Sequence, residues 1–158
     1  MKRFQLICLG LLLACLLCGC AAEKKAEEAA PKTCAEWADT IAASAGFQEL
    51  ADANAKYLEK HLMVEADSLE DWCLRMDNTR ATPEMICVVK VKAGANQADA
   101  KKALEDYRNE QITAYRDYQP DQVVKLENAR VLENGAYLVL SVSPDADKTI
   151  AALGAGWK

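Results

Sequence analysis

The segment from Gln97 to Tyr118 constrains the fold most, because it contains neither glycine nor proline and is followed closely by Pro120. Within it, apolar and aromatic residues recur at the three- and four-residue spacing of one helical face. This stripe consists of Ala100, Ala103, Leu104, Tyr107, Ala114, Tyr115 and Tyr118, and it includes one polar residue, Gln111. The segment therefore predicts one long helix that ends before Pro120 and packs its stripe against a sheet.

Two apolar segments before this helix predict an antiparallel hairpin. In residues 69–76, Trp72, Leu74 and Met76 alternate with polar residues and a cysteine, which is the pattern of a half-buried strand. Residues 85–91 (MICVVKV) predict the second strand, with Met85, Cys87, Val89 and Val91 on its apolar face. We expect Lys90 and Lys92 to leave the opposite face in water, and residues 77–83 to form the loop.

A second hairpin is predicted near the C-terminus. Residues 129–133 and 136–142 have the composition of strands, and Asn134-Gly135 joins them. This dipeptide is typical of two-residue hairpin turns, because both of its positions favour positive φ. A short helical turn at residues 120–126 precedes the hairpin, and a helix over residues 145–153 follows it.

Each hairpin is followed by a helix, so the chain contains a weak internal repeat of two ββα units. Two such units predict a four-stranded antiparallel sheet with both helices on one face, which is a two-layer α+β sandwich. Two further helices should precede this sandwich in the chain. The first begins at the capping box Thr33-Cys34-Ala35-Glu36 and ends near Gly46, and the second covers residues 48–61. The sequence leaves the arrangement of residues 33–68 open.

The N-terminus carries an export signal. Lys2 and Arg3 are followed by an apolar run, residues 4–17, that is too short for a transmembrane helix. Leu17-Cys18-Gly19-Cys20 then has the form of a lipoprotein cleavage box. Cleavage would leave Cys20 as a lipidated first residue. A second box ending at Cys15 is disfavoured because apolar residues follow it, and a non-lipoprotein signal or an uncleaved anchor is the remaining alternative.

These features divide the chain into a signal peptide (1–19), a lipidated cysteine with a flexible tether (20–32) and a single α+β domain (33–158). The tether is rich in alanine, glutamate and lysine and has no apolar period. Diacylglycerol on Cys20 would supply the two acyl chains that stable anchoring requires. We therefore expect a cell-membrane lipoprotein on the extracytoplasmic face, anchored by lipid alone.

The charge balance restricts the partners. The chain has a formal net charge of −5, and loss of Lys2 and Arg3 with the signal peptide would leave −7. A negative net charge disfavours nucleic acid and anionic lipid head groups as partners. The expected partners are the membrane, through the lipid on Cys20, and an envelope protein or a small ligand.

Several segments together resemble a known family. The matching features are MICVVKVK from Met85, Arg108-x-x-Gln111, Tyr115-x-x-Tyr118, the run from Leu126 to Val131, and Asn134-Gly-Ala-Tyr-Leu-Val-Leu. This pattern, with the final Asp-Ala-Asp-Lys helix, resembles lipoproteins of clostridial-type bacteria catalogued as domain of unknown function 4358. The resemblance covers the C-terminal two thirds of the chain and implies the same layout of lipobox, tether and domain, with no known activity.

The sequence offers little catalytic chemistry. His61 is the single histidine, and the cysteines after Cys20 are scattered, so zinc sites and histidine-based triads lack components. Ser141 and Ser143 have no neighbouring base, and acidic pairs such as Asp145 with Asp147 suit a helix N-terminus. The sequence predicts no catalytic residue, no metal site and no cofactor.

The remaining candidate site is a polar and aromatic patch on the long helix, formed by Tyr107, Gln111, Tyr115 and Tyr118. Its rings can form a packed core whose hydroxyls reach backbone or water, or they can line a shallow groove for a ligand or partner. Solvent exposure distinguishes the two. The leading hypothesis is a non-enzymatic binding module of the cell envelope, and the alternative is an envelope hydrolase that uses acidic residues.

Strand alternation also predicts the state of the thiols. Cys87 should lie on the apolar face of its strand, whereas Cys73 should lie on the opposite face of the sheet, because side chains alternate at every residue. A Cys73–Cys87 disulfide is therefore not expected. Cys34 and Cys87 are interpreted as small buried hydrophobic residues, and any other pairing among the three stays open.

Overall fold

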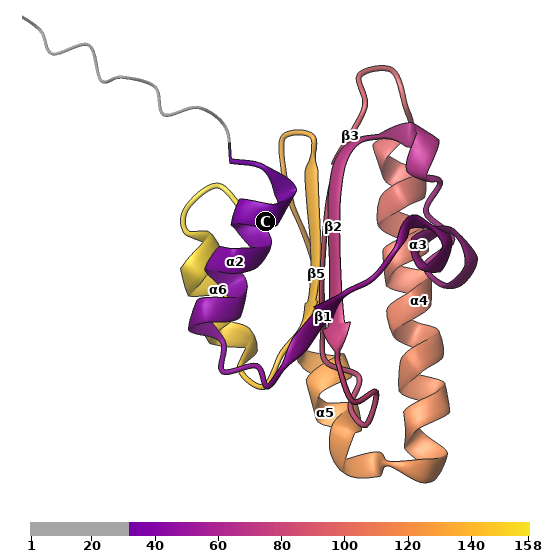
Figure 1. Ribbon diagram of the computed structural model, residues 1–158, viewed down its shortest axis with the longest axis vertical. Helices are drawn as coiled ribbons and strands as arrows, with labels where there is room; N and C mark the ends of the chain where they lie inside the picture. The colour runs from indigo at the N-terminus through magenta and orange to yellow at the C-terminus, as the bar shows by residue number, and fades with distance from the viewer. Residues whose placement is uncertain (1–31) are drawn as a thin grey trace, which may run out of the picture. The chain divides into compact units, whose positions relative to one another are not determined.

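The computed structural model describes residues 32–158, which form an antiparallel five-stranded sheet covered by helices (Figure 1). The strand order is β1-β2-β3-β5-β4. The predicted signal peptide, Cys20 and the tether up to Pro31 lie outside the described residues. Within residues 32–158, no helix has both the length and the apolar character needed to span a bilayer.

The elements follow the chain in this order: α2 (Cys34–Ser44), β1 (Leu50–Asp52), α3 (Ala55–His61), a 3-10 turn (Ala66–Ser68), β2 (Leu69–Asp77), β3 (Met85–Val91), α4 (Gln97–Tyr118), α5 (Pro120–Asn128), β4 (Val131–Asn134), β5 (Tyr137–Val142) and α6 (Ala146–Leu153). The α+β class and the long helix are thus confirmed. Helix α4 has the predicted limits, and Pro120 is the first residue of α5.

The sequence predicts that the helices after the two hairpins, α4 and α6, lie on one face of a two-layer sandwich. This prediction is wrong. Helices α2 and α6 cover one face of the sheet, while α3, α4 and α5 cover the other (Figure 1). The cause lies in β3, where Ile86 and Val88 point away from Cys87 and are fully buried against α2. A strand with apolar residues on both faces needs cover on both, so the predicted water-facing side does not exist along most of β3.

The predicted four strands become five because residues 48–61 do not form one helix. Leu50, Ala51 and Asp52 instead form edge strand β1, paired with the end of β2. The helix begins only at Ala55, where the Asn54 side chain accepts a hydrogen bond from the Tyr57 amide (3.0 Å). Asparagine is a preferred N-cap, so it starts the helix late and frees the preceding residues for pairing.

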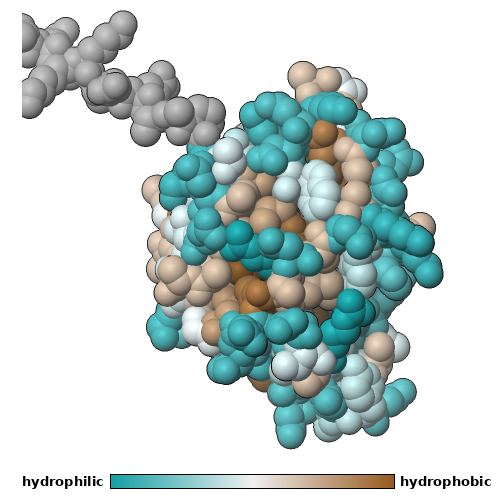
Figure 2. All heavy atoms as spheres, viewed as in Figure 1, coloured by the Kyte–Doolittle hydropathy of each residue, from teal (hydrophilic) through white to brown (hydrophobic). Residues whose placement is uncertain are grey.

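Helix α2 is the N-terminal element that the sequence places correctly. The Thr33 side chain accepts a hydrogen bond from the Glu36 amide (3.2 Å), and the Glu36 carboxylate accepts one from the Thr33 amide (2.7 Å). This reciprocal pair is the predicted capping box. The helix buries Cys34, Ala38 and Ile41 against the sheet, and hydrophobic side chains are visible between α2 and the sheet in Figure 2.

The predicted hairpin of β2 and β3 is confirmed, and its register separates the cysteines. Leu74 pairs with Cys87, whereas Cys73 pairs with Val88. Cys87 belongs to the core under α4, and Cys73 belongs to the core under α2 and α6. The three thiols of residues 32–158, including that of Cys34, are buried and free, and burial raises the pKa of each one.

The hairpin of β4 and β5 is also confirmed, but its turn lies one residue later than predicted. Asn134 pairs with Tyr137, so the two turn residues are Gly135 and Ala136. Gly135 has φ +56°, and Ala136 is not among the residues with positive φ. A glycine at the first turn position is the requirement of a type II′ turn, which also matches the twist of the strands.

Candidate functional site

The predicted patch on α4 divides into core and surface. Tyr107 and Tyr115 are each 7% exposed and belong to the core under α4, whereas Tyr118 is 60% exposed. Gln111 is half-buried between these positions. Two of the rings are thus largely buried, as a packed core requires. The exposed side chain of Tyr118 remains available for contacts outside the domain.

Three of the four patch residues line one cleft, which we call the tyrosine cleft. Tyr107, Gln111 and Tyr115 form its α4 wall, and it has a volume of about 180 Å³. The opposite walls come from α3, the end of β2 and the β2–β3 loop, through Tyr57, Met76, Asp77, Arg80, Thr82 and Pro83. Tyr118 lies outside this lining, but its ring centroid is 4.9 Å from that of Tyr115.

Asp77 organises the loop that forms one wall of the cleft. Its Oδ1 accepts hydrogen bonds from the Thr79 amide (2.9 Å) and hydroxyl (2.8 Å). Its Oδ2 accepts two more from the Thr82 amide and hydroxyl, both at 2.8 Å. Burial opposes ionisation of Asp77, but the donors of Thr82 and Thr79 prevail and lower its pKa from 3.8 to about 2. The carboxylate is therefore ionised and fixed.

Arg80 lies at the tip of this loop in an uncommon conformation. It is exposed and has φ +57°, a region that non-glycine residues seldom occupy. Its amide donates a hydrogen bond to the Asp77 carbonyl (3.1 Å), which closes the turn. The Asp77 hydrogen bonds thus order the loop that places Arg80 in the lining of the tyrosine cleft.

The hydroxyls of Tyr107 and Tyr115 are neutral. Burial is the main cause that raises the pKa of Tyr107, and Tyr57 raises it further. Burial also raises the pKa of Tyr115, with Tyr118 as the second cause. These phenols can donate or accept hydrogen bonds, but they cannot act as bases at neutral pH. The cleft therefore presents ring faces and polar handles rather than reactive groups.

A partly buried ion pair is formed by Glu84, the residue before β3, and Lys125. Glu84 is 3% exposed, and its Oε1 lies 2.6 Å from the Lys125 Nζ of α5. The Glu84 carbonyl also accepts a hydrogen bond from the Asp77 amide (2.9 Å). Sequence reasoning missed both acids. The signal for Asp77 is two threonines two and five residues later, because aspartate commonly accepts hydrogen bonds from nearby amides in turns.

The residues whose types could bind a metal ion or act as nucleophiles do not come together at one site. In the part of the chain that the structure describes, no cluster of histidine, cysteine and carboxylate side chains could hold a metal ion. His61 is the last residue of α3 and stacks on Tyr57, with ring centroids 4.3 Å apart. The three described cysteines are buried in two different cores.

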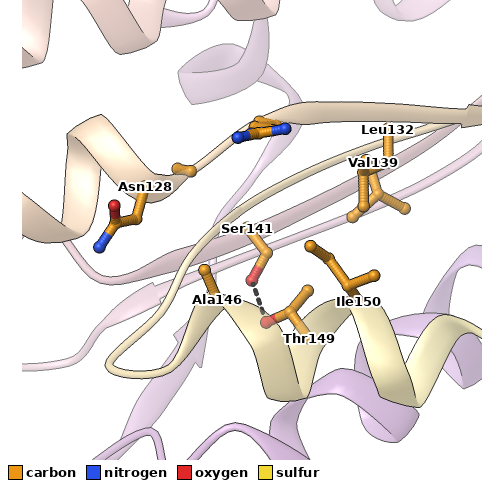
Figure 3. A pocket seen from close by; sticks show the side chains of 9 residues that line it. Asn128, Leu132, Val139, Ser141, Ala146, Thr149 and Ile150 are labelled. Carbon is orange, nitrogen blue, oxygen red and sulfur yellow. Dashed lines mark hydrogen bonds between the residues drawn. The ribbon is translucent and has the colours of Figure 1, made fainter. Parts of the chain in front are cut away.

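Ser141 and Ser143 form a buried hydroxyl cluster with Thr149 of α6. Figure 3 shows Ser141 and Thr149 pointing toward each other, at an oxygen–oxygen distance of 3.4 Å. The Thr149 hydroxyl donates to Ser143 Oγ at 3.1 Å. The adjoining cavity measures about 10 Å³, which is room for about one water molecule. This cluster therefore satisfies polar atoms within the core and does not form a substrate site.

A protein-family model described as domain of unknown function (DUF4358) matches residues 43–143. The matched region runs from the end of α2 to the residue after β5, so it contains every residue of the tyrosine cleft. No curated protein and no solved structure matches the chain. The description of the family assigns no activity.

Proposed function

The chain belongs to the DUF4358 family, and we propose that it is a lipid-anchored, extracytoplasmic binding module that holds an envelope protein at the tyrosine cleft. The observation that carries this proposal is the composition of the cleft. Three tyrosines surround it beside Arg80 and Gln111. Tyrosine and arginine are enriched among the residues that dominate binding energy at protein interfaces.

The size of the cleft favours a protein over a free small ligand. Ligand pockets commonly measure about 300–1,000 Å³, whereas this cleft measures about 180 Å³. A space of this size suits one anchoring side chain of a protein partner. The exposed ring of Tyr118, which is tilted against that of Tyr115, would extend the contact beyond the cleft. The partner would then bury both the cleft and this ring.

The hydrolase alternative has less support. Asp77 is the carboxylate in the cleft wall, and its pKa is lowered to about 2. A general acid for hydrolysis at neutral pH needs a raised pKa instead. Glu84 is bound to Lys125 and does not line the cleft. No observation on these carboxylates favours acid–base catalysis.

The membrane anchor is tested by processing at Cys20. Protein extracted from membranes should have Cys20 as its N-terminal residue, carrying diacylglycerol, because the box at residues 17–20 precedes the tether. The measurement is mass spectrometry of the intact protein and its N-terminal peptide. The Cys20→Ala variant should keep its signal peptide and lack lipid. Cleavage and lipidation of that variant at Cys15 would show that the upstream box is used instead.

The binding site is tested by filling the cleft. A photo-crosslinking amino acid at Tyr118 should capture a partner in intact membranes, because this ring is 60% exposed beside the cleft. Gln111→Trp should reduce the yield of that adduct at least about tenfold, since a displaced anchor commonly costs more than about 1.4 kcal/mol. The yield is measured by blotting of the crosslinked species.

Thr113→Trp is the matched control, because Thr113 is exposed on α4 and does not line the cleft. It should leave the adduct unchanged. Thermal unfolding of both variants distinguishes a blocked cleft from a damaged fold. An adduct that persists at full yield in a folded Gln111→Trp protein would contradict the proposed site.

A further inference from the structure

A groove runs along α4 on the other side of Tyr107 from the tyrosine cleft. It consists of two adjoining spaces of about 370 Å³ and 290 Å³. Met63 and Asp99 line both spaces, and Tyr107 lines the second space as well as the tyrosine cleft. We call the two spaces together the α3–α4 groove. It extends along α4 from Asn96 to Glu110.

Met63 is the apolar feature of this groove. It follows α3 and is 73% exposed, more than any other large hydrophobic residue of residues 32–158. Its φ is +53°, a conformation that costs free energy for a residue with a long side chain. The backbone conformation holds an apolar side chain in solvent between the two spaces, where an apolar group of a partner could cover it.

The charge of the groove is negative. Its lining carboxylates are Glu65, Asp99, Asp106 and Glu110. Lys102 is the lysine of the lining, and it is paired with Asp106. Within residues 32–158, no ion pair involves Glu65, Asp99 or Glu110. Hydrophilic side chains also dominate the visible surface on the side where α3 and α4 lie (Figure 2).

We propose that the α3–α4 groove binds a cationic segment of the partner protein, with one apolar residue of that segment packed on Met63. This inference rests on the proposed function and names the chemistry of the partner. Lysine or arginine side chains complement the carboxylates of Glu65, Asp99 and Glu110, and complementary charge accelerates and orients association. A second copy of this acidic chain would bring like charges together, so the groove favours a different protein.

The test uses the purified lipoprotein in zwitterionic lipid nanodiscs, with a fluorescein-labelled peptide of alternating lysine and serine and one central leucine. Fluorescence anisotropy should show binding that weakens as salt rises, because exposed charges are screened. Asp99→Asn with Glu110→Gln should weaken binding about tenfold, since two exposed ion pairs together contribute a factor of about that size. Empty nanodiscs provide the background, and a glutamate–serine peptide should not bind.

The matched control is Asp147→Asn with Glu127→Gln. It removes the same charge from exposed acids, and Asp147 lies in the first turn of α6 as Asp99 lies in the first turn of α4. It should leave binding nearly unchanged. Equal losses in the two double variants would overturn the proposal, because the effect would then follow net charge rather than the groove. Peptide affinity that is unchanged in both double variants would overturn the proposal as well.

Met63→Asn separates binding from folding. Asparagine tolerates positive φ better than methionine, so the variant should unfold at the same or a higher temperature. It should nevertheless bind the peptide several-fold more weakly, because the apolar contact is lost. Unchanged binding would contradict the role of Met63. These results are independent of the crosslink at Tyr118, so failure of the groove and failure of the tyrosine cleft can be told apart.

Discussion

Leu104→Ala should lower the free energy of unfolding by about 2–5 kcal/mol, the range for removal of a fully buried leucine side chain. Leu104 is 0% exposed and lies in the core between α4 and the sheet. The substitution removes apolar surface from the core and leaves a cavity, because the rigid sheet cannot close around it completely. Urea unfolding of the wild type and the variant, followed by circular dichroism, measures the difference.

The control for this substitution is Asp117→Ala, because Asp117 is exposed on the same helix and forms no ion pair within residues 32–158. Its effect should stay within about 0.5 kcal/mol. Lys101 is a poorer control, since its Nζ lies 3.3 Å from Glu133 of β4. A loss below about 1 kcal/mol for Leu104→Ala would contradict the packing of α4 on the sheet.

Asp77→Asn should destabilise the protein by about 2–4 kcal/mol at pH 7, because a buried carboxylate that accepts four hydrogen bonds is replaced by a neutral amide. The amide nitrogen of asparagine would face donors of Thr79 or Thr82. We expect the β2–β3 loop to lose its order first. Chemical unfolding gives the free energy, and faster amide hydrogen exchange in residues 77–84 would locate the damage.

The same residue predicts a dependence of stability on pH. The pKa of Asp77 is lowered from 3.8 to about 2 in the folded protein, so its contribution is complete above about pH 4. The contribution, about 2–2.5 kcal/mol, is lost as the pH falls through 2. The difference in unfolding free energy between the wild type and Asp77→Asn should therefore narrow between pH 4 and pH 2. A constant difference would show that the carboxylate is not held in its charged form.

The sequence predicts the elements with strong local patterns. Helix α4 has the predicted limits because its stripe continues without glycine or proline from Gln97 to Tyr118. The hairpins are found because alternation and turn residues are local signals. The capping box at Thr33 belongs to the same class. The opposite positions of Cys73 and Cys87 follow from alternation as well.

The parts that the sequence misplaces depend on contacts between distant segments. Strand β1 is short, and it exists because Leu50 and its neighbours pair with the far end of β2. The sheet is covered on its second face because α2 and α6, from opposite ends of the described chain, pack there. The continuous apolar run at Ile86–Val89 indicates this second covered face. An interpretation by alternation alone instead places the side chains of that face in solvent.

The candidate site was predictable in part. The stripe of α4 identifies Tyr107, Gln111 and Tyr115, which the structure brings together at one cleft. The helical pattern cannot separate these from Tyr118, whose exposure follows from its position near the end of α4. Arg80 and the Asp77 network come from the loop. Their positions depend on hydrogen bonds that no periodicity reveals.

The most direct test of a binding module on the α4 side compares two photo-crosslinker positions in native membranes. Tyr118 lies beside the tyrosine cleft, and Ile150 is an exposed apolar residue of α6 on the opposite face of the sheet. We expect a discrete protein adduct from position 118 and none from position 150. Adducts from position 150 alone, with position 118 unreactive, would place the partner on the other face and contradict this account.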